Sequence, residues 1–139
     1  MITGFYLIAS LFPKPRYVGV GDQRSMITHD HTLLLGPFCG KPACQFINVL
    51  PGCARGVCAG AFLQQKTIIV PNVDEHPGHI ACDGETKSEI VCPLILHSEH
   101  DQPVLGVLDL DCLALGGFDE EDERGLVSIT DLIVRSCDW

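Results

Sequence analysis

The alternation of hydrophobic and polar positions predicts that most of this chain forms strands. Apolar runs rich in β-branched and aromatic residues, bounded by glycine, proline or polar clusters, are typical of strands. Such runs occupy residues 4–12, 32–38, 45–49, 67–70, 88–96 and 103–111. The polar tip at residues 97–102 separates the last two runs and predicts an antiparallel hairpin.

Two segments have a helical period instead. Residues 56–65 predict a short helix with Val57, Ala61 and Leu63 facing inward. A longer helix is predicted after Asp119, a suitable N-cap residue that is followed by acids at 120–122. The apolar positions at helical spacing in that segment are Leu126, Ile129, Ile133 and Cys137. Together the elements predict an α+β fold, an antiparallel sheet with helices packed on it.

The length and net charge of the chain exclude some classes of function. The chain has 139 residues, which suits one domain spanning 1–139, with long polar connections at 13–30 and 71–88. Its formal charge of −9 argues against nucleic acid or an anionic membrane as the main partner. No apolar run reaches the roughly 18 residues that a membrane span needs. We therefore expect neither a nucleic-acid nor a membrane partner.

The eight cysteines could form a disulfide framework, bind metal or take part in catalysis. The N-terminal apolar segment has no preceding basic residue and no clear cleavage site, so we expect a reducing compartment, the cytoplasm. No Cys-x-x-Cys motif occurs, and the histidines lie in pairs in polar stretches, among them His97 and His100. Turn residues are the preferred interpretation of these pairs, so no metal site is predicted.

One cysteine lies in a setting that suits a reactive thiol. Cys82 follows Gly78 and His79 in a polar loop and precedes Asp83. A neighbouring base or dipole would lower the pKa of its thiol and make it reactive. The alternative is a buried thiol that acts as a small hydrophobic side chain.

Three acids are predicted to lie together. Asp109 and Asp111 alternate with leucines, so both project from one face of a strand. Glu89 begins the other hairpin strand, and antiparallel pairing brings that start beside the end of the Asp109–Asp111 strand. A solvated sheet face is the alternative. In a pocket, clustering would raise the pKa of one carboxyl, which suits a redox reaction that takes up protons or a site for an ammonium group.

Several motifs in order along the chain resemble one family. They are residues 4–7, 35–38, 40–44, 55–58, 78–83, 88–91, 106–111 and 118–122. The most specific are Gly-His-Ile-Ala-Cys-Asp at 78–83 and Ser-Glu-Ile-Val at 88–91. The set resembles the free methionine-(R)-sulfoxide reductases, which are stand-alone GAF domains. This resemblance implies a central antiparallel sheet with helices on one face and the pocket on the other.

The resemblance also implies thiol-dependent reduction of free L-methionine-(R)-sulfoxide, with roles for the matching cysteines. Cys82 matches the active-site cysteine, Cys44 the cysteine that closes a disulfide with it, and Cys58 a third that resolves or relays the disulfide. Which of the three attacks first stays open. The product on the attacking cysteine would be a sulfenic acid, and a thioredoxin-like reductant would restore the thiols. No bound cofactor is expected, and a homodimer is left open.

The other matched residues would contact the substrate. Glu89, Asp109 and Asp111 match carboxylates that hold the substrate and polarise the sulfoxide. Tyr6 matches an aromatic residue near the substrate methyl group.

The sequence also departs from the family pattern. Met1 begins almost at the first strand, so the family's N-terminal helix is expected to be missing, and Ile2 replaces a tryptophan of the pocket. Residues 13–30 and 48–54 are longer than usual. Five cysteines are interpreted as buried or incidental: Cys39, Cys53, Cys92, Cys112 and Cys137. The missing helix and the missing tryptophan favour the alternative function, a GAF-type small-ligand-binding or redox-sensing module without turnover.

Overall fold

A computed structural model describes residues 2–13, 29–80, 84–97 and 101–139. Its centre is a six-stranded sheet in the order β3-β2-β1-β6-β5-β4, in which every pair of neighbouring strands is antiparallel. The strands are β1 (Ile2–Ile8), β2 (Thr32–Gly40), β3 (Phe46–Asn48), β4 (Ile68–Val70), β5 (Ser88–Ile95) and β6 (Val104–Cys112). The helices are α1 (Val57–Gln64) and α2 (Glu120–Ser136), and short 3-10 turns lie at η1 (Ala9–Leu11), η3 (His29–His31) and η4 (Val73–Glu75). The predicted α+β architecture is confirmed.

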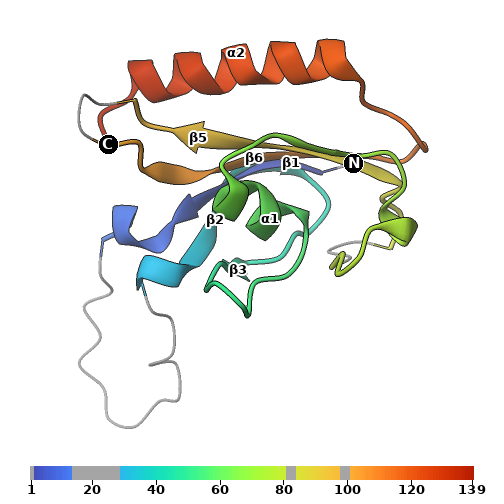
Figure 1. The fold of residues 1–139 in the computed structure, drawn as a ribbon, viewed down its shortest axis with the longest axis horizontal. Coiled ribbons are helices and arrows are strands. Elements are labelled where there is room, and N and C mark those ends of the chain that lie inside the picture. The colour runs from blue at the N-terminus through green and yellow to red at the C-terminus, as the bar shows by residue number, and fades with distance from the viewer. Residues whose placement is uncertain (1, 14–28, 81–83, 98–100) are drawn as a thin grey trace, which may run out of the picture.

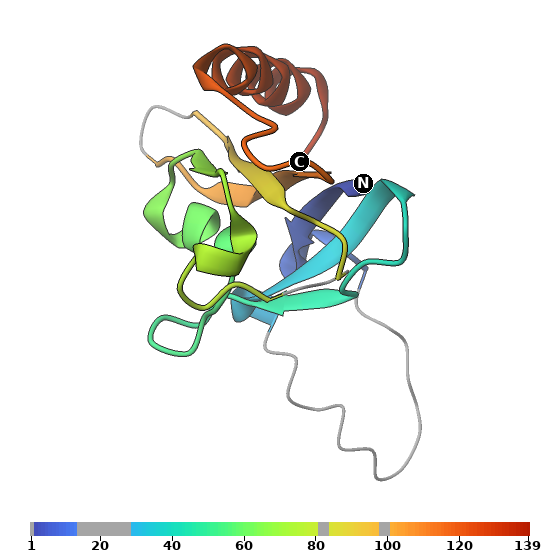
Figure 2. The ribbon, with the colours of Figure 1, turned by 90° about the vertical axis from the view of Figure 1, so that its right-hand side faces the viewer.

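The two helices lie on opposite sides of the sheet. Helix α2 runs along one face, and α1 lies on the other with the loops around it (Figures 1 and 2). Each side has its own apolar cluster: Leu94 and Leu105 pack with Val134 of α2, and Val91 and Val107 pack with Val57 of α1. Because both faces are covered, nearly the whole of β5 is buried.

The predicted hairpin is confirmed, and its register determines the position of the acids. β5 and β6 pair with Glu89 opposite Asp111 and Val91 opposite Asp109. β1 then pairs with the other edge of β6, with Gly4 opposite Asp109. The strand that carries two of the acids therefore lies inside the sheet, where each neighbouring strand restricts access of water to it.

The predicted N-terminus of α2 is also confirmed. Asp119 Oδ1 accepts hydrogen bonds from the backbone N–H groups of Glu121 (2.7 Å) and Asp122 (3.1 Å). The Asp122 carboxylate in return accepts from the Asp119 N–H at 3.0 Å, which completes a capping box.

Some predicted boundaries and faces are wrong. The first strand ends at Ile8, where its pairing with β2 stops, and not at residue 12. Leu63 is 41% exposed, because it lies two positions from the buried Ala61 and so points to another side of a helix. On α2 the buried residues are Thr130 and Val134, and the predicted Ile129 is 48% exposed.

Cys137 is exposed as well, because α2 ends at Ser136. The connection at 71–88 contains the 3-10 turn η4, and most of the connection at 13–30 lies outside the described residues. Within the described ranges, neither helix has the length and hydropathy of a membrane span.

Candidate functional site

A cavity of about 280 Å³ lies on the α1 side of the sheet. Strands β5 and β6 provide its polar floor. Its walls come from β1, β3, α1, the segments that precede α1, and the connection between β4 and β5. Six of the seven site residues predicted from the sequence line this cavity: Tyr6, Cys44, Cys58, Glu89, Asp109 and Asp111. The seventh, Cys82, lies outside the described residues.

The floor of the cavity carries the three predicted acids. Glu89 is 5% exposed, and Asp109 and Asp111 are each 7% exposed. The alternative of a solvated sheet face is therefore wrong for these positions. The acids converge because the hairpin register sets Glu89 opposite Asp111 and because Asp109 lies two residues away on the same face of β6.

Burial changes the protonation of two of these acids. Desolvation, reinforced by the charge of Asp109, raises the pKa of Glu89. Desolvation and the charge of Asp111 raise the pKa of Asp109. Among the described residues, Asp109 Oδ1 is a buried side-chain oxygen without a hydrogen-bond partner. The floor therefore holds carboxyl groups that retain protons at neutral pH and can donate them.

Cys58 lies directly above this floor, near the N-terminus of α1. Gly56, with a φ of 87°, turns the chain into the helix, and the Cys58 thiol then donates to Glu89 Oε1 at 3.9 Å. Desolvation, followed by the charge of Asp109, raises the pKa of this thiol. The helix N-terminus would favour the thiolate, but burial among acids outweighs it, so Cys58 is a protonated thiol in this state.

Tyr6 extends from β1 into the same cavity and is 1% exposed. Burial, and next the nearby Cys58 thiol in its ionised form, raises the pKa of the Tyr6 phenol. The ring is therefore a neutral, largely apolar wall that carries one hydroxyl group. Ile2, on the same face of β1, adds a second apolar side chain and is also 1% exposed.

His79 is a site residue that the sequence interpretation did not select. Its Nε2 lies 3.6 Å from Glu89 Oε2, and its side chain is 14% exposed. Burial, followed by the charge of His76, lowers the pKa of the imidazole. In the sequence, His79 is marked only by its place in the motif at 78–83. The fold brings it next to Glu89, ten residues further along the chain.

The cysteines divide by their surroundings. Cys44 lines the cavity and is disulfide-bonded. Cys92 is a buried thiol that accepts a hydrogen bond from Thr67 Oγ1 at 3.6 Å, as expected of a core cysteine. Cys39, Cys53 and Cys137 are exposed thiols, and Cys112 is half-buried. Cys53 nevertheless lines the cavity mouth.

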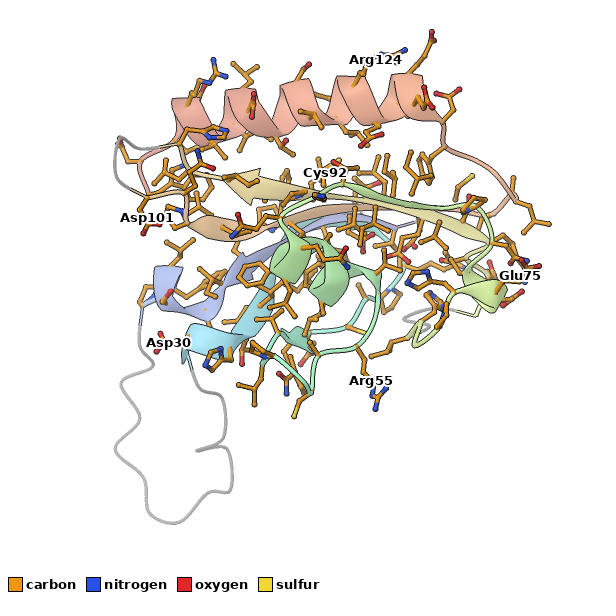
Figure 3. All side chains as sticks on the ribbon, in the orientation of Figure 1. Asp30, Arg55, Glu75, Cys92, Asp101 and Arg124 are labelled. Carbon is orange, nitrogen blue, oxygen red and sulfur yellow. The ribbon has the colours of Figure 1, made fainter. Side chains whose placement is uncertain are left out.

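One group of possible metal ligands occurs within the described ranges, and it is on the cavity floor. A sulfur of Cys58 and carboxylate oxygens of Glu89 and Asp109 lie within 4.8 Å of one another. Arg55 is at the rim, and its side chain points away from the sheet (Figure 3). The cavity thus combines neutral carboxyl groups and a thiol on its floor with an apolar wall.

Comparison with known proteins assigns the chain to a family. The family model for the GAF domain matches residues 14–136. The chain belongs to the GAF domain family. As expected from the sequence, this GAF domain has a central antiparallel sheet. The expected placement of the helices on one face and the pocket on the other is wrong, because α2 covers one face while α1 lies on the opposite face, beside the pocket (Figure 1).

Two curated relatives share a name. This GAF domain is 50% identical over 110 residues to a protein named free methionine-R-sulfoxide reductase from Saccharomyces cerevisiae, covering 79% of this chain and 57% of the yeast protein. It is 43% identical over 100 residues to the protein of that name from Escherichia coli, covering 72% of this chain and 56% of that protein. The chain thus spans little more than half the length of these relatives.

A solved structure supports the same relationship. The X-ray structure of free methionine-R-sulfoxide reductase from Neisseria meningitidis in complex with its substrate superimposes with a TM-score of 0.71 at 36% identity. The match covers 96% of this chain and 65% of the Neisseria chain.

Proposed function

We propose that this GAF domain reduces free L-methionine-(R)-sulfoxide to L-methionine with thiols as the electron source. The observation that carries the proposal is a buried pair of carboxyl groups with raised pKa values, Glu89 and Asp109, in one cavity with the Cys58 thiol and the disulfide-bonded Cys44. The names of the yeast, E. coli and Neisseria proteins support the same substrate.

The proposed chemistry needs a proton at the sulfoxide oxygen. The Cys82 thiolate reacts with the sulfoxide while Glu89 or Asp109 donates a proton to its oxygen. The oxygen is transferred to the cysteine, so methionine leaves and Cys82 becomes a sulfenic acid. Attack by the Cys44 thiol releases water and forms a disulfide, which Cys58 would resolve or relay. A thioredoxin-type dithiol in a reducing compartment such as the cytoplasm restores both thiols by exchange.

The remaining cavity residues would select the substrate. Asp111, with whichever of the other acids is ionised, would pair with the α-ammonium group of the free amino acid, which a peptide-bound methionine sulfoxide lacks. Tyr6 would contact the methyl group through its buried ring. Both assignments follow the matching positions in the family, and the burial of Asp111 and Tyr6 in one cavity supports them.

A turnover assay tests the proposal. Purified protein, thioredoxin, thioredoxin reductase and NADPH are mixed with each epimer of free methionine sulfoxide, and NADPH loss is followed at saturating thioredoxin. We expect oxidation of NADPH with the (R) epimer only, loss of turnover in Cys82→Ser, and retention in Cys137→Ser, whose thiol is exposed and away from the cavity. Equal turnover of both epimers, or full activity in Cys82→Ser, would contradict the proposal. Light scattering of the same sample tests the homodimer.

A GAF-type ligand-binding or redox-sensing module is the second candidate. It is favoured by Ile2, which stands at the cavity wall where the resembled family has a tryptophan. Such a module would bind methionine sulfoxide in calorimetry and show no NADPH loss, so the two measurements together separate the candidates.

A further inference from the structure

The cavity floor offers three ligand atoms of mixed chemistry from distant parts of the chain. Cys58 comes from α1, Glu89 from β5 and Asp109 from β6. One ligand atom from each lies within 4.8 Å of the other two, and all three residues are buried. The Cys58 Sγ to Glu89 Oε1 distance is 3.9 Å.

These separations approach those of a tetrahedral zinc site. With Zn–S near 2.3 Å and Zn–O near 2.0 Å, tetrahedral ligands are separated by about 3.5 Å for sulfur and oxygen and about 3.3 Å for two oxygens. The 3.9 Å distance therefore needs to shorten by only a few tenths of an ångström. Side-chain rotation can supply this, because all three ligands line the cavity.

An unsatisfied atom marks the same place. Asp109 is 7% exposed, and its Oδ1 is buried and without a hydrogen-bond partner within the described part of the chain. A buried oxygen without a partner costs free energy that a bound cation would recover. This observation is independent of the distances among the three ligands.

We propose that the cavity floor is a binding site for Zn²⁺, with Cys58, Glu89 and Asp109 as ligands. Sulfur among the donors favours zinc over magnesium or calcium, which prefer oxygen ligands alone. Three protein ligands leave a fourth position open toward the cavity, and His79, at 3.6 Å from Glu89 Oε2, lies next to it. The bound ion occupies the floor on which the substrate would rest, so zinc inhibits turnover; this consequence alone rests on the proposed function.

Cobalt absorption provides the test, with Co²⁺ as a coloured probe for the zinc site. The protein is used without reductant, so that Cys44 stays disulfide-bonded as in the structure. We expect one equivalent of Co²⁺ to give the intense visible bands of a tetrahedral site and a thiolate-to-cobalt charge-transfer band, both abolished by one equivalent of Zn²⁺. Substrate is absent, so the result of this test does not depend on whether the protein reduces methionine sulfoxide.

Variants identify the ligands. Cys58→Ser should lose the charge-transfer band, and Asp109→Asn should weaken Co²⁺ affinity by about tenfold or more. Cys39→Ser and Cys137→Ser, whose thiols are exposed and outside the cavity lining, serve as thiol controls and should match the wild type. No tetrahedral spectrum in the wild type, or an unchanged band in Cys58→Ser, would overturn the proposal. A zinc-dependent rise in the melting temperature, present in the wild type and lost in folded Asp109→Asn, provides the second measurement.

Discussion

The buried acids make the stability of this protein depend on pH in an unusual direction. Glu89 has a pKa raised from 4.5 to about 9, and Asp109 has one raised from 3.8 to about 8. Between the unfolded and folded values the folded state keeps a proton that the unfolded state has lost. The free energy of unfolding must therefore fall as pH rises through this window.

The size of the effect follows from proton counting. One proton retained only by the folded state changes the free energy of unfolding by about 1.4 kcal/mol per pH unit. Counting a single carboxyl as the minimum, stability decreases by about 3 kcal/mol between roughly pH 5 and pH 7. His79 acts in the opposite direction, because its lowered pKa makes the protein more stable as pH rises.

Urea unfolding followed by circular dichroism at a series of pH values measures this dependence. In the Glu89→Gln, Asp109→Asn double variant neither amide titrates, so the downward slope should disappear while the contribution of His79 remains. Asp138→Asn, an exposed carboxylate at the C-terminus, is the matched control and should keep the wild-type slope. If wild type and double variant show the same slope between pH 5 and pH 7, the raised pKa values are wrong.

Two further predictions concern the scaffold. Gly106→Ala should destabilise the protein by about 3 kcal/mol or more, because an added Cβ would lie 2.1 Å from the Tyr6 carbonyl oxygen across the β1–β6 pair. Gly125→Ala should instead stabilise the protein by about 0.5–1 kcal/mol, because Gly125 has open space around it in α2. Asp119→Ala should cost about 1 kcal/mol, because it removes the capping box, whereas Asp138→Asn should cost nothing measurable. Thermal melts check both predictions, and equal melting temperatures for the two glycine variants would contradict the first.

Local patterns in the sequence determined much of this fold. The β5–β6 hairpin was predictable because its strands are adjacent in the chain and its polar tip fixes which ends meet. The start of α2 was predictable because Asp119 caps backbone groups only two and three residues away. The meeting of Glu89 with Asp111 follows from the same hairpin register, so the acid cluster was predictable as well.

Only the tertiary structure determined the contacts, the burial and the pKa values of these residues. The Cys58 thiol contacts Glu89, which lies 31 positions away in the sequence. Strand β1 pairs with β6, the last of the six strands, although four other strands separate the two in sequence. The exposure of Leu63 and Ile129 and the burial of Asp109 depend on which faces α1, α2 and β1 cover. Hydrophobic periodicity predicts which side chains share a face of a helix or strand, but not which of those faces another element covers. The pKa of a carboxyl depends on how much water the rest of the fold removes from around it.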